Sequence, residues 1–271
     1  MRTNATVSCR PVPHVTRTSG AVVLELHPAA PYSGSDPRNV QSLGIALERQ
    51  RGVHAIGSDV RVDFDAWPGA LAYTPPGIDV FSESPVGGEY LVARWEGADP
   101  LSAARRIELP GHRAAVTLGR RIRKALLASH PDPLALEQLT LQFIGLRPHS
   151  SVQTPPSRAA VRNTLDRISD EYARPLTLAD LASFANQTPL QFLREFTRAV
   201  GMTPHAFITE TRLQASRRML GHSEAPLATI AAECGFSHQS HMGSAFRRML
   251  GMTPGEYRRV HRLVEAGPNA T

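Results

Sequence analysis

Cysteine and long apolar runs are both scarce in this chain of 271 residues. Its only cysteines are Cys9 and Cys234, so a framework of several disulfides and a four-cysteine zinc site are both excluded. No run approaches the roughly 18 apolar residues that a transmembrane helix requires. Residues 1–19 lack the apolar segment of a secretory signal. These absences predict a protein that stays in the cytoplasm.

Lysine is almost missing as well, since Lys124 is the single lysine among 30 basic residues. Against 24 acidic residues, these basic residues give a net charge of +6. A basic chain is compatible with a polyanionic partner, although a bias toward arginine also follows from a GC-rich genome. The chain is 41% hydrophobic, which suffices for a packed core, and its length is that of one large or two ordinary domains.

Motifs of nucleotide-binding and hydrolytic enzymes are missing too. The sequence contains no G-x-x-x-x-G-K-[ST] loop, no G-x-G-x-x-G after a strand, no H-E-x-x-H helix and no G-x-S-x-G elbow. His27, His54 and His112 are scattered instead of forming an H-x-H pair. We therefore expect no catalytic site, no metal site and no cofactor, and we predict that the protein is not an enzyme.

The first part of the chain has the pattern of a β-rich domain. Short apolar runs separated by Gly/Pro turns are typical of a sandwich or a barrel. The predicted strands are residues 21–26, 43–48, 60–64 and 89–95, with a turn at 73–77.

Two predicted helices follow, over residues 114–129 and 133–146. Each carries apolar residues at spacings of three and four, which places them on one face. In the first helix, Arg123 and its basic neighbours lie largely off that face. The apolar faces either pack on the β-rich domain or form a dimer interface. Residues 147–157 hold three prolines and three serines, a composition typical of a linker.

An internal repeat is the most informative feature of the second half. The tetrapeptide G-M-T-P occurs at residues 201–204 and again at 251–254. At the same offset Phe196 matches Phe246, and Phe207 matches Tyr257. Further upstream the offset falls by one, which predicts one extra residue in the turn of the second copy.

Each copy reads as a short helix, a tight turn and a second helix, the pattern of a helix-turn-helix unit. In the first copy Thr177 and Thr188 are predicted N-caps, and Gly201 is a predicted helix end. The predicted helices of the two copies run over residues 178–185, 189–200, 226–234 and 238–250.

A helix over residues 204–220 would join the two copies and measure about 25 Å at 1.5 Å per residue. Second helices of such units fit the major groove, and successive grooves on one face of DNA lie about 34 Å apart. The repeat therefore predicts a domain that binds two successive major grooves. The alternative is a helical bundle with a duplicated hairpin and no DNA.

The second half resembles the AraC/XylS family of bacterial transcription regulators. The resemblance covers residues 161–259 and depends on a set of short motifs. They are Leu178–Ala182, Phe192–Phe196, both G-M-T-P segments, Arg212–Ala215, Leu220, Ile230–Ala231, Gly235–Phe236, Phe246–Arg247 and Tyr257–Arg258. Residues 68–77 resemble, more weakly, the cupin-like sensor domain of such regulators.

The resemblance implies an α+β protein of two domains. Residues 1–146 would form a cupin-like β-barrel with two following helices, and residues 158–260 an all-α domain with two helix-turn-helix units. Residues 147–157 would be the linker and 261–271 a tail. The partners it implies are double-stranded DNA, RNA polymerase, a small-molecule effector and a second copy of the chain.

The predicted DNA-reading residues lie on the outward faces of the second helices. In the first copy Leu190, Leu193 and Arg194 match family positions that meet bases. Two of these are leucines, which can touch a thymine methyl but cannot hydrogen-bond a base. In the second copy the base-reading candidates are Gln239, Ser240, His241 and Ser244. Candidates for phosphate contacts are Gln191, Arg198, His238, Arg247, Arg248 and Arg258.

The sequence thus predicts an effector-responsive transcription regulator, and it leaves open whether the protein is an activator or a repressor. Two alternatives stay open. The first half could answer to a protein partner instead of a small ligand, or a barrel enzyme could carry the DNA-binding domain.

Overall fold

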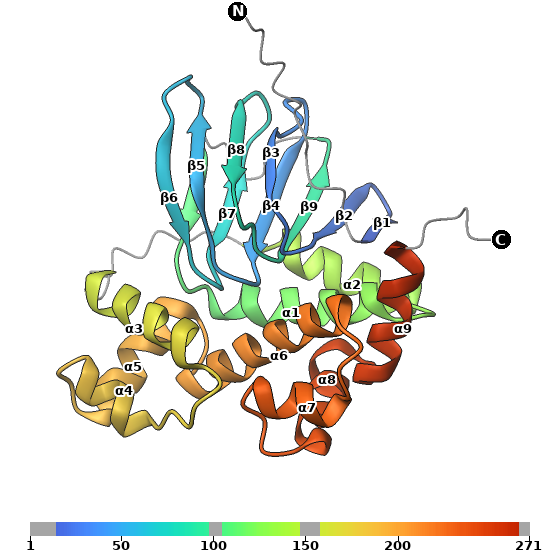
Figure 1. The fold of residues 1–271 in the computed structure, drawn as a ribbon. Coiled ribbons are helices and arrows are strands. Elements are labelled where there is room, and N and C mark those ends of the chain that lie inside the picture. The colour runs from blue at the N-terminus through green and yellow to red at the C-terminus, as the bar shows by residue number, and fades with distance from the viewer. Residues whose placement is uncertain (1–14, 98–104, 147–157, 266–271) are drawn as a thin grey trace, which may run out of the picture. The chain divides into compact units, whose positions relative to one another are not determined.

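The computed structural model describes residues 15–97, 105–146 and 158–265 (Figure 1). Internal contacts divide the chain into two compact units. We call residues 1–126 with 131–152 the β-domain, and residues 127–130 with 153–271 the helical domain. The predicted linker, Cys9 and the end of the predicted tail lie outside the described residues. No described helix is both long and apolar enough to cross a membrane.

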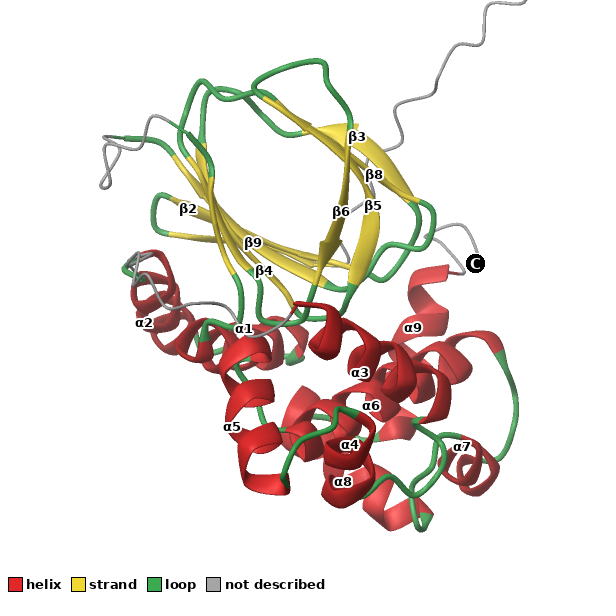
Figure 2. Cartoon of the chain, turned by 90° about the vertical axis from the view of Figure 1, so that its left-hand side faces the viewer, coloured by secondary structure: helices red, strands yellow, loops and turns green. Residues whose placement is uncertain are grey.

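The β-domain contains two antiparallel sheets, seen edge-on in Figure 2. A six-stranded sheet has the order β1-β2-β9-β4-β7-β10, and a four-stranded sheet has the order β3-β8-β5-β6. The strands are β1 Val15–Ser19, β2 Val22–His27, β3 Tyr32–Ser35, β4 Gln41–Ala46, β5 Gln50–Ile56, β6 Val62–Ala66, β7 Leu71–Thr74, β8 Val80–Ser84, β9 Tyr90–Trp95 and β10 Ile107–Leu109.

This part of the chain is β-rich as predicted, but its described strands do not close into a barrel. The strands predicted over 21–26, 43–48, 60–64 and 89–95 are present as β2, β4, β6 and β9. The pattern missed β1, β3, β5, β8 and β10. In β5, for example, Gly52 and His54 interrupt the apolar alternation that marks a strand. The turn predicted at 73–77 begins later in the structure, because Tyr73 and Thr74 are the last residues of β7.

One face of the six-stranded sheet forms the apolar core with helix α1 (Arg113–Leu127). Leu26, Leu91, Ile45 and Leu71 lie side by side across four neighbouring strands, and each is at most 2% exposed. Gly119 of α1 faces this row, since a Cβ there would lie 3.0 Å from Ile45. The second predicted helix is present as α2 (Pro133–Ile144).

The expectation that Arg123 lies off the buried face of α1 is wrong. Its side chain is fully buried, and its Nη1 atom lies 2.8 Å from Glu89 Oε2, which is 1% exposed. Burying a charge costs free energy unless the charge is paired. Arg123 can be buried because Glu89, on the loop before β9, supplies the opposite charge.

The helical domain contains seven described helices, and they match the predicted elements closely. They are α3 Arg158–Glu171, α4 Leu178–Phe184, α5 Pro189–Val200, α6 Pro204–His222, α7 Leu227–Glu233, α8 Gln239–Leu250 and α9 Pro254–Glu265. Helices α4 and α5 form the first helix-turn-helix copy, and α7 and α8 form the second. Helix α6 joins them (Figure 1).

Candidate nucleic-acid interface

The two copies share the same turn geometry. Asn186 and Gly235 both adopt the left-handed conformation, with φ of 54° and 78°. The next residue donates its backbone N–H at 2.9 Å in each copy, from Gln187 to Ala182 and from Phe236 to Ala231. The two turns therefore begin with the same backbone conformation and the same hydrogen bond.

Helix caps confirm the predicted boundaries of the first copy. Thr177 and Asp180 form a reciprocal capping box, and the Thr188 hydroxyl accepts from the Gln191 backbone N–H. Gly201 ends α5 in the left-handed conformation, with φ of 75°. These side chains satisfy backbone groups that a helix terminus leaves without partners.

A histidine takes the capping position in the second copy. His238 Nδ1 accepts from the His241 backbone N–H at 3.1 Å and lies 2.7 Å from Ser240 Oγ. His238 stands 50 residues after Thr188, whereas the left-handed turn residues are 49 apart. The predicted extra residue is thus Ser237, placed between the turn and the cap. The match of His238 with Thr188 was a signal for this capping role, but His238 was predicted only as a phosphate contact.

Aromatic contacts hold each second helix to the helix that follows it. The rings of Phe196 and Phe207 are 5.7 Å apart at 70°, and those of Phe246 and Tyr257 are 5.9 Å apart at 70°. These pairs place one face of α5 and of α8 in the core. The opposite faces of α5 and α8 remain available to contact another molecule.

All but one of the residues predicted for the free face of α5 are exposed. Leu190 is 57% exposed, and Gln191, Arg194 and Arg198 are also exposed, whereas Leu193 is only partly exposed. Leu190 is therefore the more accessible of the two leucines that were predicted to touch a base.

The free face of α8 is more polar. Gln239, Ser240, Ser244, Arg247 and Arg248 are all exposed. Among the described residues the structure records no ion pair for the arginines of either free face: Arg194, Arg198, Arg247 and Arg248. These guanidinium groups are accessible to an anion.

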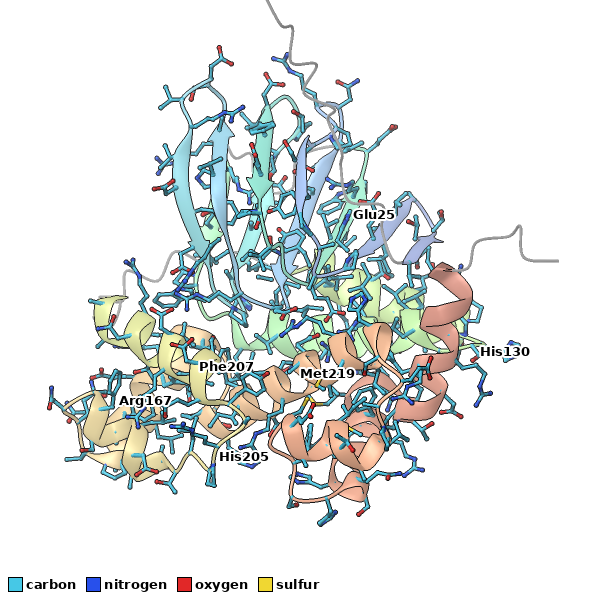
Figure 3. All side chains as sticks on the ribbon, viewed as in Figure 1. Glu25, His130, Arg167, His205, Phe207 and Met219 are labelled. Carbon is cyan, nitrogen blue, oxygen red and sulfur yellow. The ribbon has the colours of Figure 1, made fainter. Side chains whose placement is uncertain are left out.

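His241 is partly buried at the start of α8. Its Nδ1 lies 3.1 Å from Ser237 Oγ, and its ring meets Phe236 edge-on at 5.3 Å. Burial lowers the pKa of His241, and the neighbouring side chains of His238, Arg212, Arg248 and His205 lower it further. Those four side chains belong to α6 and to α8 with its N-cap. Figure 3 labels His205 at the start of α6.

Arg258, another predicted phosphate contact, is already engaged within the domain. Its Nη2 atom donates to the backbone carbonyl of Ala225 at 2.6 Å. This bond ties α9 to the segment just before α7. A phosphate contact would have to use the remaining donors of the guanidinium group.

Comparisons with known proteins agree with this geometry. A family model described as a helix-turn-helix domain matches residues 181–260. The chain is 34% identical over 90 residues to the probable transcriptional regulator LumQ of Photobacterium leiognathi, which covers 33% of this chain and 36% of LumQ. It is 31% identical over 136 residues to a putative AraC-like transcription regulator of Streptomyces lividans, covering 49% of this chain and 45% of that protein.

Among solved structures, the DNA-binding domain of AdpA in complex with a target DNA is similar to this chain at 23% identity. That similarity covers 40% of this chain and 97% of the AdpA domain, with a TM-score of 0.39. The chain spans less than half of the length of the two curated relatives above. From the duplicated motif and the family match together, the C-terminal part of this chain carries a helix-turn-helix domain of the AraC type.

Proposed function

We propose that the chain is a sequence-specific DNA-binding transcription regulator that inserts α5 and α8 into two successive major grooves. The observation that carries this proposal is the duplication itself: two copies that each have a left-handed turn residue, a side-chain cap on the second helix, and an exposed face whose arginines form no ion pair within the described part of the chain. A single helix-turn-helix would occupy one groove, whereas two on one chain read a longer site.

The residues divide into two roles on this proposal. Arg194 reads guanine and Gln239 reads adenine, since their side chains match those bases in bidentate geometry. Leu190, Leu193, Ser240, His241 and Ser244 complete the base-reading set. Gln191, Arg198, His238, Arg247, Arg248 and Arg258 contact phosphates, which positions the domain without specifying sequence.

Selection of random DNA duplexes on the full chain tests this proposal. We expect an enriched sequence with two short boxes about one helical turn apart. Arg194→Ala should relax one box and Gln239→Ala the other. Arg121→Ala, which removes an equal charge from an exposed position on α1 of the β-domain, should change neither. Binding without any enriched box, or equal effects of all three variants, would contradict the assignment of bases.

For the β-domain we propose a cupin-like sensor of a small-molecule effector. The second face of the six-stranded sheet supports this proposal, because it carries buried charged groups beside apolar residues such as Val92. On that face Arg94 pairs with Glu25 at 3.1 Å and with Asp36 at 2.9 Å. Tyr90 lies on the same face of the six-stranded sheet. Polar groups gathered between two sheets can orient a polar ligand.

We further propose that α2 mediates a homodimer. Leu134 is 74% exposed and Leu141 is 57% exposed, and their spacing of seven places them on the same side of the helix. Leu134→Glu with Leu141→Glu should convert a dimer to a monomer in sedimentation experiments, whereas Gln142→Glu on the same helix should not. A wild-type monomer at all concentrations would refute the dimer.

On this proposal, effector binding or dimerisation shifts an equilibrium that changes DNA affinity or contact with RNA polymerase, and the protein acts as an activator in the bacterial cytoplasm. Promoter transcription measured with and without the β-domain's effector would test that coupling. An effector that changes neither DNA affinity nor transcription would refute it.

A further inference from the structure

A short segment that precedes both helix-turn-helix copies contacts elements of both. It consists of Tyr172, Ala173 and Arg174, which directly follow α3. Neither α3 nor this segment belongs to the residues that the family model matches. The contacts of this segment are therefore additional to those within the duplicated motif.

On one side, α3 is attached to the first copy. Arg167 Nη1 donates to the backbone carbonyl of Asp180 at 3.4 Å, and the guanidinium carbon lies 4.8 Å from the ring centroid of Phe184. Figure 3 labels Arg167 on this helix. Leu165 and Ile168 of α3 are fully buried. Helix α3 is thus held against α4 by both packing and polar contacts.

On the other side, the segment is attached to α6 and to the core of the second copy. Arg212 of α6 donates from Nε to the carbonyl of Tyr172 at 2.7 Å and from Nη2 to the carbonyl of Arg174 at 3.0 Å. Tyr172 also packs against the apolar cluster that includes Phe236 and Met242. One arginine therefore closes the end of α3 with two charge-assisted hydrogen bonds.

The turn of the second copy approaches the same segment closely. A Cβ at Gly235 would lie 2.7 Å from both Cα and O of Ala173, which is too close for real atoms. The left-handed φ alone does not require glycine here, because Asn186 adopts it at the matching position of the first copy. Glycine at 235 is needed for the approach of Ala173.

We propose that residues 172–174, held by Arg212 and accommodated by Gly235, form a clasp that sets the orientation of α8 relative to α5. Helix α6 packs against α5 through Phe207 and shares a core cluster with α8 through Leu213 and Leu220. The clasp adds a second attachment between the copies, which runs through α3 and restricts their rotation further. The clasp thereby determines which spacing between the two DNA boxes the protein accepts. This inference rests on the proposed function of α5 and α8.

Binding to duplexes with altered box spacing tests the clasp in the full chain. Adding one base pair between the boxes moves and rotates the second site, so the wild type should lose about tenfold or more in affinity. Gly235→Asn and Arg212→Met should reduce that penalty to less than about threefold, and Arg212→Lys, which keeps the charge but has a single donor nitrogen, should lie between. Asn186→Gly is the matched control and should leave the penalty unchanged.

The outcomes separate the clasp from a general loss of folding. If both variants weaken binding at every spacing by the same factor, the clasp is refuted. A wild type that tolerates all spacings equally also refutes it. A wild type that binds no duplex refutes the proposed function instead.

If the wild type binds no duplex, a distance measurement that requires no DNA still tests the clasp. Ser183 and Ala232 occupy equivalent exposed positions in α4 and α7, so spin labels on Ser183→Cys and Ala232→Cys report the distance between the copies. Cys9 is replaced by serine, and buried Cys234 stays unlabelled. Arg212→Met should broaden this distance distribution at unchanged helix content. An equally narrow distribution would overturn the proposal.

Discussion

Replacing Arg123 by methionine should destabilise the β-domain by about 3–5 kcal/mol, the cost of removing one partner of a buried ion pair. The side chains of Arg123 and Glu89 are 0% and 1% exposed, and their charged atoms are 2.8 Å apart. Methionine preserves most of the side-chain volume. The loss therefore comes from the Glu89 carboxylate, which would stay buried without its cation.

Tryptophan fluorescence during urea unfolding measures this loss selectively. Both tryptophans of the chain, Trp67 and Trp95, belong to the β-domain, so their signal is independent of the helical domain. Arg121→Met, an exposed change on the same helix, should alter stability by less than about 0.5 kcal/mol. Adding Glu89→Gln to Arg123→Met should recover part of the loss, because no charge is then buried.

Acidity provides a second check on the same reasoning. Without Arg123, burial would raise the pKa of Glu89 in the folded state above its unfolded value. Folding would then take up a proton, so the deficit of Arg123→Met relative to the wild type should shrink as the pH falls through that raised pKa. A cost below about 1 kcal/mol, or a deficit that grows on acidification, would refute the buried-pair argument.

Three further predictions concern single groups. Gly201→Ala, at a φ of 75°, should destabilise the helical domain by about 1 kcal/mol in circular dichroism melts, whereas Gly243→Ala, whose added Cβ meets nothing within 4 Å, should stabilise it slightly. Because the pKa of His241 is lowered in the free chain and the phosphates of nearby DNA would raise it in the complex, DNA affinity should increase as the pH falls through the pKa of the bound imidazole, and His241→Gln should flatten this dependence in fluorescence anisotropy. Burial alone would raise the pKa of Glu25, but its partners His27 and Arg94 lower it to about 2, so the β-domain should lose stability as the pH falls from 4.5 toward 2, and Glu25→Gln should be less sensitive in an acid titration of tryptophan fluorescence.

Helix boundaries in the second half were predictable because their signals are local. A cap, its partner three residues later and a glycine at the end lie within one helix, so Thr188 and Gly201 suffice to mark α5. The repeat supports these helix boundaries independently, since each boundary occurs twice at a nearly constant offset. The free faces of α5 and α8 followed from the same spacing that places Phe196 and Phe246 in the core.

Strands of the β-domain were harder to predict because their stability comes from distant partners. β5 pairs with β6 and with β8, which lies far along the chain, and these neighbours compensate for its weak alternation. The order of strands in a sheet depends on pairings between distant segments, which no local pattern encodes. The sequence therefore could not show whether the predicted strands close into a barrel.

The sequence by itself therefore determined the helices, the duplicated unit and the residues that α5 and α8 present outward, because each depends on neighbours within a few turns of chain. Only the tertiary structure decided that Arg123 is buried and that Arg212 and Gly235 meet the end of α3. Arg123 and its partner Glu89 are 34 positions apart, and Arg212 and Tyr172 are 40 positions apart. Only folding brings such groups within bonding distance.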